Sequence, residues 1–206
     1  MNIGIIGAGN VGGGLGRLLA KQGHQIRFGV RDLHKDSVVA LLAETGANAA
    51  AVSVAEAVAF GEIVVLAVGW GAVEDVMMAA RDWQGRILID ATNRFSDAPR
   101  SAAEDIAAMA PGARVVKAFN TIGAEQLAQP VFDGDPASMF VCGDDADAVK
   151  IVSELAAGLG FEPVDCGPLA NAALLESMAR LWVYLARNKT GRDVAFALLR
   201  RGEDSA

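Results

Sequence analysis

Three glycines near the start of the chain, Gly7, Gly9 and Gly12, have the G-x-G-x-x-G spacing that binds a dinucleotide between a strand and a helix. Residues 2–6 form an apolar run typical of a buried strand, and leucines then recur at helical spacing. In such a turn the first glycine makes the bend, the second admits a pyrophosphate, and the third lets helix and strand pack closely. The helix N-terminus attracts the phosphates through free N–H groups and its dipole. The residues predicted to contact the pyrophosphate are Gly7, Ala8, Gly9, Asn10, Val11 and Gly12.

The residues that end the second expected strand distinguish NAD from NADP. Enzymes that use NAD usually have an acidic residue there for the ribose hydroxyls, whereas this strand ends in Val30 followed by Arg31. A guanidinium is a planar fork of donors suited to a phosphate, and Lys35 adds a second positive charge. In the alternative interpretation Asp32 binds the ribose and Arg31 faces solvent, but we favour Asp32 as the cap of the following helix. The sequence therefore predicts NADP(H).

Few side chains offer acid–base chemistry. Of the two histidines, His24 starts a strand at the wrong end of the sheet, and His34 lies on the expected adenosine side. Lys117 is the remaining candidate proton donor; because it lies inside the sixth expected strand, packing or pairing is the alternative role. Hydride exchange between two redox rings needs less, since the protein only stacks the rings and excludes water.

Residues at the expected strand ends suit such a pocket, because aromatic, amide and small side chains gather at one edge of a parallel sheet. We predict that Val68, Gly69, Trp70, Asn93 and Asn120 contact the dinucleotide, and that Trp70, Phe119 and Thr121 face a second substrate.

Strand and helix patterns alternate along the first part of the chain. The nearly continuous apolar run at 62–68 is typical of a parallel strand that is buried on both faces. This alternation predicts an α/β fold with a Rossmann-type, doubly wound parallel sheet whose ligands lie beyond the strand C-termini. The expected strands are 2–6, 25–30, 49–52, 62–68, 86–90 and 114–119.

A turn-rich segment at 130–136 divides the chain into a predicted Rossmann domain, 1–129, and a small α/β C-terminal part, 137–206. The C-terminal part is expected to contain strands at 139–142 and 161–165 and helices at 146–159, 169–187 and 191–201.

Composition excludes several classes of protein. The net charge of −7 argues against a nucleic-acid or anionic-membrane partner. The longest charge-free apolar run, 63–73, is too short to cross a bilayer, and no signal peptide is expected. Cys142 and Cys166 lack zinc-site spacing and are expected to be buried thiols, so no metal site is predicted. We expect a soluble cytoplasmic protein.

Four blocks of sequence resemble the deazaflavin-dependent NADP oxidoreductases, also called NADPH-dependent coenzyme F420 reductases. One block is VVKAFNT; two others, VCGDD and GPLANAALLE, are more specific than the glycine motif, and the resemblance covers nearly the whole chain. KAFNT also resembles the cytosolic reductase domain of six-transmembrane metalloreductases. The four blocks are 6–16 with 23–31, 115–121, 141–145 and 167–176.

The resemblance implies hydride transfer between NADP(H) and deazaflavin coenzyme F420, which binds in a cleft between the two parts, and it implies a homodimer. It places Arg31 at the 2′-phosphate and makes the helix after residue 168, with Met178 and Trp182, a wall of the cleft. Relatives carry hydroxyl side chains where this chain has Ala8 and Val30. Each absent hydroxyl removes a hydrogen bond of roughly 0.5–1.5 kcal/mol, which weakens the preference for NADP.

Three functions remain open at this point. The first is hydride exchange between NADP(H) and a small redox acceptor, either a deazaflavin or a flavin-like molecule. The second is an NADP-dependent dehydrogenase of a small carbonyl or imine that uses Lys117 as proton donor. The third is a non-catalytic NADP-binding sensor, which binds NADPH but has no acceptor that oxidises it.

Overall fold

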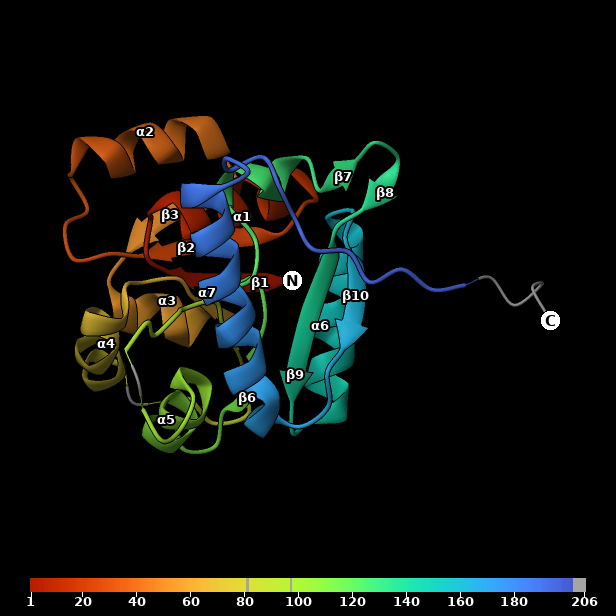
Figure 1. Ribbon diagram of the computed structural model, residues 1–206. Coiled ribbons are helices and arrows are strands. Elements are labelled where there is room, and N and C mark those ends of the chain that lie inside the picture. The colour runs from red at the N-terminus through yellow and green to blue at the C-terminus, as the bar shows by residue number, and fades with distance from the viewer. Residues whose placement is uncertain (81, 97, 202–206) are drawn as a thin grey trace.

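The computed structural model describes residues 1–80, 82–96 and 98–201. Within these residues an eight-stranded sheet runs through the centre in the order β10-β9-β6-β5-β4-β1-β2-β3 (Figure 1). Strands β1 to β6 are parallel, β9 is antiparallel to β6, and β10 is parallel to β9. The strands of this sheet are β1 (Asn2–Ile6), β2 (Gln25–Gly29), β3 (Ala49–Val52), β4 (Ile63–Leu66), β5 (Ile87–Asp90), β6 (Arg114–Lys117), β9 (Ser138–Gly143) and β10 (Glu162–Asp165).

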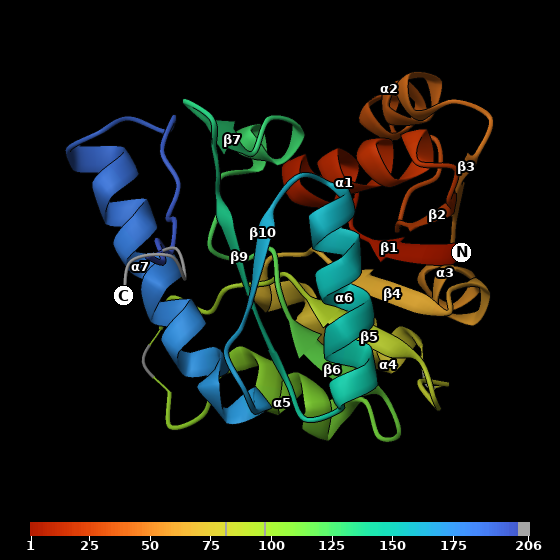
Figure 2. The ribbon, with the colours of Figure 1, turned by 90° about the vertical axis from the view of Figure 1, so that its right-hand side faces the viewer.

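Helices cover both faces of the sheet, with α1 and α2 on the side opposite α3, α4 and α5 (Figure 2). Helix α6 packs on β9, β10 and β6, and α7 packs against α5. The helices are α1 (Asn10–Lys21), α2 (Asp36–Thr45), α3 (Val54–Phe60), α4 (Val73–Ala79), α5 (Ala102–Met109), α6 (Ala146–Gly158) and α7 (Ala172–Asn188), with short 3-10 turns η1 (Trp70–Ala72), η2 (Ala124–Ala128) and η3 (Leu169–Asn171).

Side chains of the central strands alternate between two hydrophobic cores. Ile3 and Ile5 contribute to the core under α1, α2 and α6, whereas Val64 and Leu66 contribute to the core under α3, α4 and α5. Burial on both faces explains why these strands are continuous apolar runs rather than alternating ones. The predicted α/β, doubly wound fold is therefore confirmed, together with its smaller C-terminal part.

The segment at 130–136 forms a small antiparallel hairpin of β7 (Val131–Phe132) and β8 (Asp135–Pro136). After it, β9 returns to the main sheet, where Lys117 pairs with Cys142 in the antiparallel register. One sheet therefore runs through both predicted parts, and the division into 1–129 and 137–206 stays a prediction.

The helix predicted at 191–201 is wrong. Residues 192–201 contain neither helix nor strand, and Figure 1 shows them leaving α7 and running past β9 and β10. The backbone N–H of Ser138 donates to the carbonyl of Phe196 at 2.9 Å, and the N–H of Leu198 donates to Ser138 Oγ at 2.9 Å. Pairing along β9 satisfies these backbone groups, so tertiary contacts override the helical pattern of the segment.

Candidate functional site

The main candidate site is a cavity of about 890 Å³ at the carboxyl ends of β1, β2 and β4. Its volume lies within the range of small-molecule and cofactor sites. Eight of the residues predicted from sequence to contact a dinucleotide line it: Gly7, Ala8, Gly9, Asn10, Arg31, Lys35, Val68 and Gly69.

The three glycines of the turn are needed for different steric reasons. Gly7 has φ +105°, and a Cβ there would lie 2.5 Å from the carbonyl oxygen of Ala67. A Cβ on Gly12 would lie 2.1 Å from the carbonyl oxygen of Gly7, so this residue lets α1 approach β1. A Cβ on Gly9 would meet no atom within 4 Å, because this glycine faces the open cavity. The turn thus leaves room for a ligand at its centre and packs tightly at both ends.

Helix α1 begins at this turn with its N-terminus available to an anion. Gly9 is the N-cap residue, no side chain caps the helix, and its first turn contains no acidic residue. The N–H groups of the first helical turn have no intrahelical partners, and the helix dipole adds positive potential. A diphosphate fits this chemistry, and the volume beside the turn accommodates the rest of a dinucleotide.

Two cations lie on the side of the cavity formed by the β2–α2 connection. Arg31 and Lys35 are both exposed, and neither forms an ion pair within the described part of the chain. Lys35 is also the N-cap residue of α2, without a capping side-chain hydrogen bond. The prediction that Asp32 caps this helix is wrong: its Oδ1 accepts from the backbone N–H of His34 at 2.9 Å, which stabilises the turn instead.

The opposite wall of the cavity was not predicted from the sequence. There α3 contributes its first residue, Val54, and the η1–α4 segment contributes one face. The members of this face are spaced i, i+3, i+4 and i+7, a helical signal readable from sequence once the cavity is known to abut α4. They are Ala72, Asp75, Val76 and Ala79.

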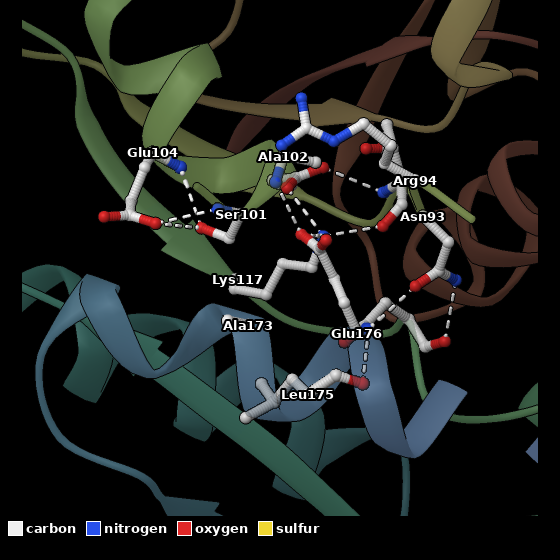
Figure 3. A network of polar contacts seen from close by, with 12 residues as sticks. Asn93, Arg94, Ser101, Ala102, Glu104, Lys117, Ala173, Leu175 and Glu176 are labelled. Atoms are coloured by element: carbon white, nitrogen blue, oxygen red, sulfur yellow. Dashed lines mark hydrogen bonds and ion pairs between the residues drawn. The ribbon is translucent and has the colours of Figure 1, made fainter. Parts of the chain in front are cut away.

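A buried polar network lies at the same sheet edge, beyond the cavity, at the ends of β5 and β6. The ammonium of Lys117 is 2.8 Å from Asp90 Oδ2, 2.6 Å from the carbonyl oxygen of Thr92 and 3.2 Å from Glu176 Oε1. Lys117 and Asp90 are 0% exposed and Glu176 is 4% exposed. Figure 3 shows Glu176 pointing from α7 toward Lys117. Lys117 therefore pairs with two carboxylates in this structure, and a catalytic role for Lys117 stays a prediction.

Glu176 also connects this network to α5. Its Oε1 accepts from the backbone N–H of Ala102 at 2.8 Å, at the first residue of α5. Ser101 and Glu104 complete a capping box at the same helix end (Figure 3). One carboxylate therefore holds α7 to both α5 and β6.

Asn93 and Asn120 form a reciprocal pair beside the network. Asn93 Nδ2 donates to the carbonyl of Asn120, and Asn120 Nδ2 donates to Asn93 Oδ1, both at 3.0 Å. Asn120 Nδ2 also donates to the carbonyl oxygen of Leu175 at 3.2 Å, which ties the pair to α7. Neither asparagine lines the cavity, so their contact with a dinucleotide stays a prediction.

The residues predicted to face a second substrate are mostly internal. Phe119 is 3% exposed with φ +61°, and its ring meets that of Phe161 edge-on at 6.4 Å. Thr121 is also buried, and Trp182 is buried with its N–H donating to the carbonyl of Val194 at 2.9 Å. Met178 is half-buried. None of the four lines the main cavity, and their place in an acceptor cleft stays a prediction.

Trp70, predicted to contact both the dinucleotide and the second substrate, is not among the residues that line the main cavity. It follows Gly69 of the cavity wall, and the guanidinium of Arg94 lies 4.6 Å from its ring centroid. Arg94 also pairs with Asp105 at 2.6 Å and donates to the carbonyl of Arg100. Hydrogen bonds from Arg94 and then Arg100 hold the pKa of Asp105 below its usual value.

The cysteines offer no reactive thiolate to this site. Both are free, and burial raises the pKa of Cys142 to about 12. Among residues 1–80, 82–96 and 98–201, no cluster of three His, Cys, Asp or Glu side chains could hold a metal ion. Within the same residues, no helix combines the length and apolar character needed to cross a membrane.

Comparisons with known proteins agree with the geometry of the cavity. Residues 2–94 match the family model described as NADP oxidoreductase, coenzyme F420-dependent. The F420-dependent NADP reductase of Methanothermobacter thermautotrophicus is 31% identical over 207 residues, which cover 90% of this chain and 89% of that protein. A crystal structure of a candidate F420-dependent NADP reductase from Arthrobacter sp. FB24 has a TM-score of 0.87 and 28% identity, with 97% of this chain and 100% of that chain covered.

A second similarity is to a longer protein. The rat metalloreductase STEAP3 is 31% identical over 181 residues, which cover 85% of this chain. The chain spans only 36% of the length of STEAP3, so the similarity concerns one portion of that protein.

Proposed function

Because this chain belongs to the F420-dependent NADP oxidoreductase family, we propose that it transfers a hydride between NADP(H) and a deazaflavin or flavin-like acceptor. The observation that carries the proposal is the cavity at the glycine turn, where a helix N-terminus without a side-chain cap and two exposed cations converge. The family consists of NADP-dependent oxidoreductases, and the choice of acceptor is the part that is proposed.

In this proposal the chain binds NADP(H) by dividing its charges between two groups of residues. The N–H groups at the start of α1 bind the diphosphate, with Gly9 leaving the room for it. Arg31 and Lys35 bind the 2′-phosphate, which NADH lacks. When bound, NADPH supplies the hydride, and the chain fixes the position of the ring that carries it.

The acceptor side requires little acid–base chemistry from the protein. A hydride passes directly between two stacked rings, so orientation and exclusion of water suffice. Trp70, Phe119, Thr121, Met178 and Trp182 remain the proposed wall for the acceptor. A dehydrogenase with Lys117 as proton donor is a poorer match, since this ammonium is fully buried and already has three acceptors.

We also propose that two copies of the chain associate. Apolar side chains are exposed along one side of α7 and on the segment that follows it, and such a surface is typical of an interface. They are Leu174, Leu181, Tyr184, Leu198 and Leu199. Analytical ultracentrifugation of the wild type and of Leu181→Glu tests this: a dimer that becomes a monomer in the variant is expected.

The function is tested by mixing the purified protein with NADPH under anaerobic conditions and adding coenzyme F420, a flavin or a quinone. We expect the deazaflavin to be reduced as NADPH is oxidised, with slower or no reaction with the other acceptors. Binding of NADPH without oxidation by any acceptor would support the sensor instead. If oxidation occurs only with small carbonyls or imines, the dehydrogenase alternative is correct.

A further inference from the structure

The wall that the η1–α4 segment contributes to the cavity carries a single hydrogen-bonding side chain. Ala72, Val76 and Ala79 present only small apolar groups, which leaves a smooth surface. Asp75 lies on the same face and is exposed to the cavity. No hydrogen bond or ion pair of the described residues engages its carboxylate. The wall thus combines a flat apolar surface with one unused acceptor.

The cations of the cavity lie on one wall. Arg31 and Lys35 lie on the β2–α2 side, together with Asp32. The Oδ1 of Asp32 already accepts from the N–H of His34, and the glycine turn at the end of β1 lies between β2 and β4. A phosphate is attracted to those groups and repelled by the carboxylate of Asp75. The α4 wall therefore suits an uncharged portion of the ligand that is flat, apolar and able to donate a hydrogen bond.

The adenine ring of NADP(H) has these properties. The 2′-phosphate belongs to the ribose that carries adenine, so a phosphate held by Arg31 places adenine in the same half of the cavity. Val38 and Val54 add apolar surface there. The exocyclic amine of adenine is a donor, and an ionised carboxylate is only an acceptor.

We propose that Asp75 accepts a hydrogen bond from the exocyclic amine of adenine and thereby selects adenine over purines that carry oxygen at that position. This inference rests on the dinucleotide site of the proposed function and adds a residue that determines its base specificity. Its neighbour Glu74 provides a matched control, because it is an exposed carboxylate of the same helix that does not line the cavity.

The test compares the dissociation constants of NADPH and of its reduced hypoxanthine analogue, in which a carbonyl oxygen replaces the amine and the adjacent ring nitrogen carries a hydrogen. The fluorescence of the reduced nicotinamide reports binding of both, without any acceptor or turnover. In the wild type the oxygen faces Asp75, so we expect binding weaker than that of NADPH by about tenfold, the scale of one charge-assisted hydrogen bond.

Asp75→Ala should bind the two dinucleotides with affinities within about twofold of each other, because the acceptor is gone. Asp75→Asn can donate to the oxygen as well as accept from the amine, so its preference for adenine should also shrink. Glu74→Ala should keep the wild-type ratio. An unchanged ratio in Asp75→Ala, with normal helix content by circular dichroism, overturns this inference and leaves the proposed function intact. If the wild type binds neither dinucleotide, both fall.

Discussion

The glycine turn and the Lys117 network lie at one edge of the same sheet, but their polar groups differ in how far they are satisfied. At the turn, the N-terminus of α1 has no capping side chain, and Arg31 is exposed without an ion pair among the described residues. In the network, Lys117 has three acceptors, and Glu176 accepts from both Lys117 and Ala102. The turn leaves polar groups for a ligand, whereas the network uses its own to fix β5, β6, α5 and α7 together.

This difference predicts that substitutions in the two regions change different measurements. Substituting unpaired groups that face a cavity should affect ligand binding more than stability. In the free protein these groups contact only water, so the folded state loses little when they are replaced. Paired groups in the interior affect stability first, because a buried charge without its partner is costly.

The largest effect is expected for Lys117→Met, which leaves the carboxylates of Asp90 and Glu176 buried without a cation. Breaking a buried ion pair in this way should lower the free energy of unfolding by about 3–5 kcal/mol. Urea denaturation measures the change. Lys150→Met, at an exposed position of α6, is the control and should stay within about 0.5 kcal/mol of the wild type. A loss below about 1 kcal/mol in Lys117→Met would show that the network does not stabilise the fold.

Arg31→Ala tests the region of the glycine turn, whose polar groups are left for a ligand. Loss of a charge-assisted contact should weaken NADPH binding by about 1.5–3 kcal/mol and leave NADH binding nearly unchanged. Titration calorimetry with both dinucleotides separates the two, and urea denaturation should show little change in stability. Equal losses for NADPH and NADH would remove the reason for assigning the 2′-phosphate to this residue.

Two glycines of the same turn, Gly9 and Gly12, allow effects on binding and on stability to be compared directly. Gly12→Ala places a Cβ against the carbonyl of Gly7, so it should destabilise the fold by about 1–3 kcal/mol through overpacking. Gly9→Ala adds a Cβ in open space and should leave stability near that of the wild type, but weaken NADPH binding. Thermal unfolding and calorimetry measure the two effects. If Gly9→Ala is the less stable variant, the division of roles between these glycines is wrong.

Much of the fold and part of the site could be predicted from sequence because local patterns specify them. The apolar runs of β1 and β4 read as strands buried on two faces, and the glycine spacing located the turn. Arg31 and Lys35 could be predicted as well, since they lie in the connection after β2, whose end lies beside the turn.

The parts that could not be predicted depend on contacts between distant segments. Glu176 meets Lys117 only because α7 packs across the ends of β5 and β6, and nothing in the spacing of these residues shows this. Asp75 was missed because the position of α4 beside the cavity is a property of the assembled sheet. The helix expected at 191–201 failed for the same reason, since backbone bonds to Ser138 decide its conformation.

The smallest expected effect concerns Asp105, which pairs with Arg94 beside the ring of Trp70. Since these hydrogen bonds lower the pKa of Asp105, its ionised form stabilises the folded state at neutral pH. That contribution to stability is lost as the pH falls from the ordinary pKa of a carboxyl group through the lowered pKa of Asp105. Asp105→Asn should therefore reduce the free energy of unfolding by about 1 kcal/mol at neutral pH and converge with the wild type in acid.

Urea denaturation at a series of pH values measures this convergence, and Glu154→Gln, an exposed carboxylate of α6, provides the control that should follow the wild type throughout. NADPH affinity should not change in Asp105→Asn, because neither Asp105 nor Arg94 lines the cavity. A difference in stability that persists in acid would mean that the packing of the Asp105 side chain, rather than its ionised pair with Arg94, stabilises the fold. A loss of NADPH affinity would mean that the Arg94–Asp105 pair helps to position the glycine turn through Trp70. The two regions could then no longer be treated as independent.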